Sequence, residues 1–100
     1  MSKEIDMDRP MLPVSVVTER LGIHCKTLEL YSREKILFPE DTPSYGMLYS
    51  INDLEKCKFI KYLAKGLGIP LAGIKIVMKV LEKLEIAPDK YIEYVGKLLL

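Results

Sequence analysis

The sequence predicts a mainly α-helical fold, a winged helix-turn-helix domain with a short wing hairpin and additional C-terminal helices. Three observations in residues 14–54 support this prediction. A helix pattern, VSVVTERL, ends at Gly22, and a second helix pattern, HCKTLELYSREKI, follows at once. A loop with two prolines and Gly46 comes next, and a third helix pattern begins at Ile51. Winged helix-turn-helix domains arrange their elements in this order.

The first helix is expected to begin at Ser15, whose side chain can cap the first turn. Gly22 is expected to end the helix, because glycine readily adopts the left-handed conformation found at helix C-termini. Helical spacing places four residues on the inner side of this helix: Val16, Val17, Arg20 and Leu21.

The second helix is predicted to have two distinct faces. Leu28, Tyr31 and Ile36 are expected to lie toward the core. The opposite face carries residues at the spacing i, i+3, i+4 and i+7, which are Lys26, Glu29, Leu30 and Arg33. This outward face is the one available to a ligand.

The loop that follows is predicted to form the wing. Its prolines and its glycine exclude a helix, while Tyr45 and Leu48–Tyr49 are expected to form short strand edges. Ser50 is followed three residues later by Asp53, which is a variant of the capping box. We therefore expect a third helix over Ile51–Lys65.

Two further helices are predicted after Gly68. The fourth, from about residue 71 to 84, has an apolar stripe that we expect to be core: Leu71, Ile74, Met78, Leu81 and Leu84. The fifth begins after Pro88, and its stripe suits either the core or an interface with a second copy. The candidate dimer-interface residues are Tyr91, Ile92, Val95, Leu98 and Leu99.

These elements predict three segments along the chain. Residues 1–11 are polar and acidic and are expected to be a flexible N-terminal tail. Residues 12–86 form the winged helix-turn-helix domain, and residues 87–100 form a C-terminal helix that is a candidate dimerisation segment.

Composition argues against several classes of protein. Two separated cysteines, Cys25 and Cys57, and a single histidine are too few for a structural zinc site. The sequence has no glycine-rich phosphate loop and no nucleophile elbow, so neither an enzyme nor a cofactor is expected. No apolar run is long enough to span a membrane, and we expect a cytoplasmic protein.

Charge is distributed unevenly along the chain. The net charge is only +1, with six Lys and Arg against eight Asp and Glu in residues 1–50 and nine against six in residues 51–100. The half that contains the helix-turn-helix pattern is therefore the acidic half. Phosphate contacts supply most non-specific DNA affinity, so any DNA binding is expected to be modest and sensitive to salt.

Three segments together resemble one known family. They are LGIHCKTLELY from Leu21, the Gly46, Tyr49–Ser50 and Asp53–Leu54 positions, and GIPLAGIKIVMKVL from Gly68. In residues 13–84 the chain resembles the MerR-type regulators, and His24 with the LAGIK run resembles their short heat-shock-repressor branch. The resemblance implies a homodimeric bacterial transcription regulator, acting as a repressor, that binds an inverted repeat in double-stranded DNA and is associated with the nucleoid.

The chain departs from the family pattern at three positions. Glu29, Met47 and Leu48 stand where the family usually has arginines that contact phosphates or bases. Glu29 suits two interpretations: a carboxylate that accepts a hydrogen bond from a cytosine N4 amino group, or a solvated carboxylate paired with Arg33. The family's metal sensors use cysteines after the fourth helix; this chain has none there, so no metal site is implied.

The resemblance and the outward face together give a set of candidate DNA-binding residues. They are His24, Lys26, Thr27, Glu29, Leu30, Tyr31, Arg33, Tyr49, Lys58 and Lys61. Several have a structural alternative: His24 suits a helix cap, the two tyrosines suit the core with a satisfied hydroxyl group, and the lysines suit a solvated face.

Two other functions remain open from the sequence. A protein-interaction adaptor, such as a chaperone modulator, would explain the missing arginines, since an exposed Met47–Leu48 pair suits a protein partner. A DNA-bending accessory factor of the excisionase type would share the winged shape.

Overall fold

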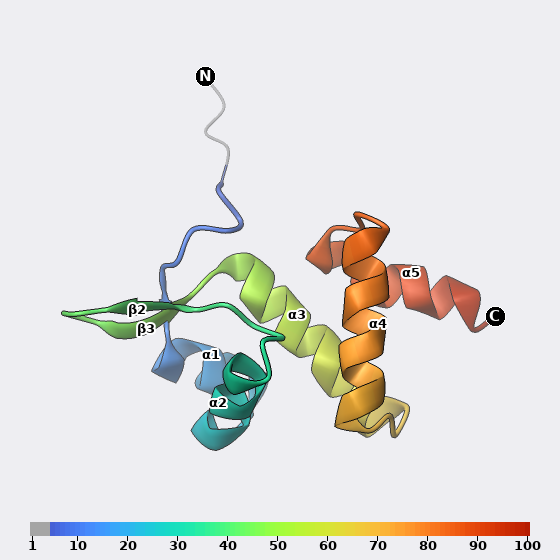
Figure 1. The fold of residues 1–100 in the computed structure, drawn as a ribbon, viewed down its shortest axis with the longest axis horizontal. Coiled ribbons are helices and arrows are strands. Elements are labelled where there is room, and N and C mark those ends of the chain that lie inside the picture. Colours follow the sequence, from blue (N-terminus) through green and yellow to red (C-terminus); the bar gives the residue numbers. More distant parts are fainter. Residues whose placement is uncertain (1–4) are drawn as a thin grey trace. The chain divides into compact units, whose positions relative to one another are not determined.

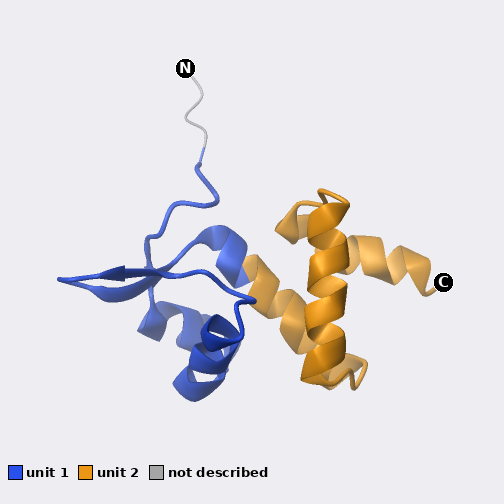
Figure 2. Ribbon diagram, in the orientation of Figure 1, with its two compact units in different colours: residues 1–54 blue, residues 55–100 orange. Residues whose placement is uncertain are grey.

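The computed structural model describes residues 5–100, which form two compact units, the first ending at Leu54 and the second beginning at Glu55 (Figure 2). Five α-helices and one small sheet make up the described chain (Figure 1). The predicted mainly helical fold with a wing hairpin is confirmed. No helix within residues 5–100 is long and apolar enough to cross a membrane.

The first unit contains the sheet and the helix-turn-helix. Its elements are β1 (Leu12–Pro13), α1 (Val14–Leu21), α2 (Cys25–Arg33), β2 (Glu40–Thr42), β3 (Gly46–Tyr49) and the first turn of α3 (Ile51–Lys61). The second unit contains the rest of α3, a π-helical turn η1 (Tyr62–Gly66), α4 (Leu71–Lys83), a 3-10 turn η2 (Pro88–Lys90) and α5 (Tyr91–Leu98).

The wing is the β2–β3 hairpin of a three-stranded antiparallel sheet with the order β1-β3-β2. The prediction for Tyr45 was wrong: Tyr45 lies in the hairpin turn, and 76% of its surface is exposed. The Thr42 side chain holds this turn, because its Oγ1 accepts from the Tyr45 N–H at 3.1 Å and donates to the Gly46 carbonyl oxygen at 2.8 Å. Gly46 has a φ of 68°, which favours glycine at this position.

The N-cap of helix α1 lies two residues earlier than predicted. Pro13, with an extended backbone, is the N-cap, and the cap makes no side-chain hydrogen bond, so Ser15 is not the cap. Proline is suited to this position because it lacks the N–H that a helix start leaves unpaired. Val17 is buried, whereas Arg20 is exposed and does not lie on the inner side as expected. Gly22 ends the helix in the left-handed conformation, as predicted.

Residues 5–11 make several hydrogen bonds to later parts of the first unit. The Met7 carbonyl oxygen accepts from the Asn52 N–H at 2.9 Å, and Asp8 Oδ1 accepts from the Asn52 side chain at 2.8 Å. The Met11 N–H donates to the Tyr49 carbonyl oxygen at 3.0 Å. The flexible tail expected over residues 1–11 thus has fixed contacts from residue 7 onward, while residues 1–4 lie outside the described residues.

The predicted capping box at the start of α3 is confirmed. Ser50 Oγ accepts from the Asp53 N–H at 3.0 Å, and Asp53 Oδ2 accepts from the Ser50 N–H at 3.1 Å. Both residues are buried. The helix then runs to Lys61 and continues as the π-helical turn η1, so the predicted end near Lys65 is correct although the last turn is not α-helical.

Replacing Ser50 by alanine is expected to lower the free energy of unfolding by about 1 kcal/mol, because the buried Asp53 N–H loses its acceptor. Urea unfolding followed by circular dichroism measures the loss. Ser15→Ala is the matched control, since Ser15 is exposed and caps nothing. A loss for Ser50→Ala no larger than that for Ser15→Ala would contradict the capping role.

Aromatic and aliphatic side chains form the core of the second unit. Phe59 packs edge-on against Tyr91, with ring centroids 5.2 Å apart and an interplanar angle of 62°. The α4 residues Ile74, Met78 and Leu81 are buried, as predicted. Leu84 is not core, because it follows the end of α4 and is half exposed.

Tyr91 cannot serve the dimer interface predicted for it, because it is buried within its own unit against Phe59. Burial raises the pKa of its hydroxyl group, and the negative charge of Glu82 raises the pKa further. The other residues predicted for that interface lie nearer the surface of α5: Ile92, Leu98 and Leu99 are exposed, and Val95 is half-buried.

Candidate nucleic-acid interface

Helix α2 is held at its N-terminus by His24. The residue has an extended backbone, and its Nδ1 accepts from the Lys26 N–H at 3.1 Å. Such a cap satisfies one of the N–H groups that a helix start leaves unpaired. Because this nitrogen accepts a hydrogen bond from the backbone, His24 positions α2, which agrees with the capping interpretation of its sequence position.

The outward face of α2 is present in the structure. Lys26, Glu29 and Arg33 are exposed on one side of the helix, while Leu28 on the other side is completely buried. The remaining candidate residues of this helix, Thr27, Leu30 and Tyr31, are half-buried. The face therefore presents two positive charges and one negative charge to solvent.

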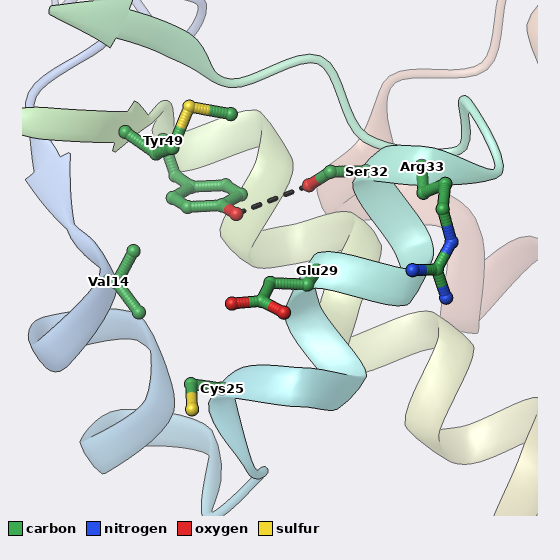
Figure 3. Close-up of a pocket in the computed structure, with 7 residues that line it drawn as sticks. Val14, Cys25, Glu29, Ser32, Arg33 and Tyr49 are labelled. Carbon is green, nitrogen blue, oxygen red and sulfur yellow. Dashed lines mark hydrogen bonds between the residues drawn. The ribbon is translucent and has the colours of Figure 1, made fainter.

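A pocket of about 370 Å³ lies beside this face, between the start of α1, α2 and β3 (Figure 3). It is lined by Val14, Cys25, Glu29, Ser32, Arg33, Met47 and Tyr49. Most of these side chains present carbon or sulfur atoms, so the pocket combines an apolar surface with the Glu29 carboxylate.

Glu29 and Arg33 do not form the ion pair that the sequence suggested. The Glu29 carboxylate points toward the Val14 and Cys25 side of the pocket, and the Arg33 guanidinium group points away from it (Figure 3). No salt bridge joins Glu29 to any residue in the described part of the chain. The carboxylate therefore remains available to a donor from a ligand.

Tyr49 was predicted as a candidate DNA contact, and its burial contradicts this. Only 2% of its surface is exposed, and its hydroxyl group lies 3.2 Å from Ser32 Oγ. Ser32 Oγ in turn donates to the Leu28 carbonyl oxygen at 3.1 Å, so the tyrosine hydroxyl group is the donor to Ser32. Tyr49 thus joins β3 of the wing to α2 and is the core aromatic that the sequence left open.

Replacing Tyr49 by phenylalanine is expected to lower the free energy of unfolding by about 1 kcal/mol, because the ring still fills its space while the bond to Ser32 is lost. Chemical denaturation measures the change. Tyr45→Phe, at the exposed tip of the wing, is the control and should leave stability unchanged. Equal stabilities of the two variants would show that the Tyr49–Ser32 bond contributes nothing.

The wing carries no positive charge. Between residues 38 and 49 the only charged side chains are Glu40 and Asp41, and both are exposed. Met47 and Leu48 are half-buried, not an exposed pair as the adaptor interpretation assumed. This wing is therefore poorly suited to bind phosphate groups, which attract lysine and arginine.

Lys58 and Lys61 belong to the second unit. Lys58 Nζ lies 2.9 Å from Glu55 Oε1, in an ion pair between neighbouring turns of α3. Lys61 is half-buried. The site described above is built from residues of the first unit alone.

Three pocket residues were not predicted from the sequence: Val14, Cys25 and Ser32. Val14 begins α1, and its place beside α2 and β3 depends on how these segments pack together. Helical spacing does place Ser32 one turn after Leu28, which could have indicated a position near the core side of α2. Nothing in the sequence indicates its partner in the wing.

Comparison with known proteins gives one family and a small group of relatives. The MerR HTH family of regulatory proteins matches residues 12–81. A Streptomyces coelicolor protein named as heat shock protein HspR is 34% identical over 76 residues, which is 76% of this chain and 50% of the relative. The HTH-type transcriptional regulators GlnR of Bacillus anthracis and Bacillus cereus are each 29% identical over 76 residues, 76% of this chain and 58% of each relative. The chain thus spans about half the length of the curated relatives it matches.

Proposed function

Because this chain belongs to the MerR HTH family of regulatory proteins, we propose that it is a sequence-specific DNA-binding transcription regulator. The family consists of regulators and not of enzymes. The proposal depends chiefly on one observation: the capped and exposed face of α2, where Lys26 and Arg33 lie on either side of Glu29. A regulator of this kind would act in the cytoplasm, on the nucleoid.

In this proposal α2 enters the major groove of double-stranded DNA. Lys26 and Arg33 contact phosphates or guanine edges, and the unpaired Glu29 carboxylate accepts from a cytosine N4 amino group. The acidic wing adds no phosphate contact. Binding is therefore weaker and depends on fewer released counterions than in a domain whose wing is basic.

The test is a fluorescence-anisotropy titration with the DNA upstream of the chain's own gene, at low and moderate salt. We expect the upstream DNA to bind at least about tenfold more tightly than random DNA of equal length. Lys26→Gln is expected to lower the slope of log affinity against log salt by about one, and Lys97→Gln on α5 to leave it unchanged. Equal affinity for both DNAs at every salt concentration would contradict the proposal.

Homodimerisation and repression are the finer parts of the proposal. The exposed α5 residues Ile92, Leu98 and Leu99 offer an apolar surface to a second copy. Sedimentation equilibrium is expected to give a dimer for the full chain and a monomer for Leu98→Asp.

Repression predicts that a reporter gene placed behind the upstream DNA is expressed more strongly when the gene for this chain is deleted. Lower expression of the reporter would contradict repression. The heat-shock name of one relative makes stress genes the first targets to test.

A protein-interaction adaptor is the second candidate function, and the pocket beside α2 favours it. The unpaired Glu29 carboxylate lines the same pocket as the apolar side chains of Val14 and Met47, a combination that suits an apolar side chain followed by a basic one. A chaperone is the kind of partner implied by the resemblance. If the titrations show no preference for any DNA, a stoichiometric protein recovered by wild-type chain but not by Glu29→Lys would support the adaptor.

A further inference from the structure

Helix α4 has a second apolar side in addition to the one that packs in the core. Ile76, Val80 and the C-cap residue Leu84 follow one another at intervals of four residues and therefore lie in one line along α4 and its end. They are 65%, 51% and 51% exposed. The buried line of Ile74, Met78 and Leu81 lies on the other side. A helix with a single packing partner needs only one apolar side, so the second line remains uncovered in the monomer.

A row of lysines runs beside the exposed apolar line. Lys75, Lys79 and Lys83 each precede one of its members by one residue, and all three are exposed. Lys79 and Lys83 form no salt bridge with any residue in the described part of the chain. Glu82, one turn after Lys79, is exposed as well, and its charge raises the pKa of Tyr91. The exposed side of α4 thus combines an apolar ridge with a row of three lysines.

We infer that this surface, the α4 ridge of Ile76, Val80 and Leu84 with its lysine edge, docks an acidic amphipathic helix of another protein. The apolar residues of the partner would cover the ridge, and its Asp or Glu residues would face Lys79 and Lys83. The ridge spans nine residues, and the eight steps between its ends are about 12 Å of helix, so two to three turns of the partner suffice. This interaction is separate from the proposed DNA binding by α2.

Charge argues against the α4 helix of a second copy as the occupant. Two α4 helices packed antiparallel about a twofold axis would bring the same flank of each helix together. The lysine row of one copy would then face the lysine row of the other. Like charges at that distance repel. An acidic helix removes this repulsion and replaces it with attraction, while the apolar ridge supplies the burial.

The ridge also argues against nucleic acid. Three aliphatic side chains beside the lysines would have to be held against sugar and phosphate groups, which offer them no apolar contact. A lipid surface is a weaker match than a helix, because the ridge has no aromatic residue and is confined to three aliphatic side chains. Protein is the occupant that uses both the apolar and the charged part of the surface.

The test is a selection with the full chain as bait against displayed 16-residue helices whose apolar positions are fixed and whose flanking positions vary among Glu, Lys and Gln. We expect selected helices to carry Glu on one flank of the apolar positions. A synthetic peptide of the most enriched sequence is then titrated against the chain by fluorescence anisotropy.

Variants separate the two parts of the surface. Lys79→Glu with Lys83→Glu is expected to weaken peptide binding about tenfold, because two attractions become repulsions. A peptide whose Glu flank is changed to Lys should restore that binding. Val80→Gln should weaken binding by a similar factor, while the matched changes Lys97→Glu on α5 and Leu100→Gln after it should not. All these positions are exposed, so thermal unfolding should be unchanged and should exclude misfolding as the cause.

Four results would each overturn the inference. They are a selection without enrichment, enriched helices without an acidic flank, binding that is unaffected by Val80→Gln, and loss of self-association on Val80→Gln in sedimentation experiments, which would make a second copy the occupant. Vesicles of phosphatidylglycerol and phosphatidylcholine, and random duplex DNA, serve as further probes. Binding of either probe that Val80→Gln abolishes would assign the surface to that ligand instead.

Discussion

Replacing Phe59 by alanine is expected to lower the free energy of unfolding by about 3–5 kcal/mol, the largest effect of any single change considered for this chain. The Phe59 ring is completely buried in the second unit. It packs against Tyr91 at 5.2 Å and Tyr62 at 6.3 Å between ring centroids. Alanine would remove both ring contacts and leave a cavity that the surrounding helices fill only in part.

A loss of this size is a large part of the total stability of a small protein, which is about 5–15 kcal/mol. Urea unfolding followed by circular dichroism and by tyrosine fluorescence measures it. The chain contains one other phenylalanine, Phe38, which is 66% exposed. Phe38→Ala is therefore the matched control and should lower the free energy of unfolding much less. Similar losses for the two variants would show that the Phe59 ring is not a central part of the core.

Replacing Glu29 by arginine is expected to raise the affinity for random duplex DNA by about tenfold or more, because a charge-assisted bond to phosphate contributes about 1.5–3 kcal/mol. Glu29 is exposed and has no ion pair in the described chain, so the change should not disturb the fold. The additional phosphate contact should also steepen the dependence of log affinity on log salt by about 0.9.

The same variant separates the two interpretations of Glu29. If its carboxylate accepts from a cytosine amino group, affinity for the specific sequence should fall by about 1–3 kcal/mol while affinity for random DNA rises. Glu93→Arg on α5 changes the net charge equally and controls for a general charge effect. Unchanged titrations with Glu29→Arg, for both DNAs, would show that this face of α2 does not contact DNA.

The parts of the fold that depend on neighbouring residues were predictable from the sequence. Ser50 and Asp53 determine the start of α3 through bonds three residues apart, and Gly22 ends α1 through its own conformation. The buried side of α4 follows from helical spacing alone. In each case the responsible residues lie within one or two helical turns of one another.

The predictions that failed concern contacts between residues far apart in the sequence. Strand β1 has only two residues, too few to show an alternating pattern, and it exists because Leu12 pairs with Tyr49. Tyr49 fitted either a phosphate contact or the core, and its bond to Ser32 decides between them. Tyr91 was misassigned because its position in the α5 stripe does not reveal that Phe59 packs on it.

The candidate site likewise has one part that the sequence predicted and one part that it did not. The outward face of α2 followed from the spacing of Lys26, Glu29 and Arg33, which one helix fixes. The pocket beside it joins Val14 and Met47 across more than thirty residues of sequence, so only the tertiary packing of α1, α2 and β3 creates it. The negative charge of the wing could be predicted without knowing its geometry, because the composition of residues 38–49 shows it directly.

The bonds between the N-terminal segment and the start of α3 have a consequence for the order of folding. Asn52 bonds both Met7 and Asp8, and the pair Asn52–Asp8 is separated by 44 residues. Closing so long a loop costs entropy before any of these contacts form, which slows folding relative to the local helices. On the ribosome, α1 and α2 can form early, but this closure must wait until Asn52 has left the exit tunnel. The completed first unit is therefore a late product of synthesis, whereas the helix proposed to read DNA is an early one.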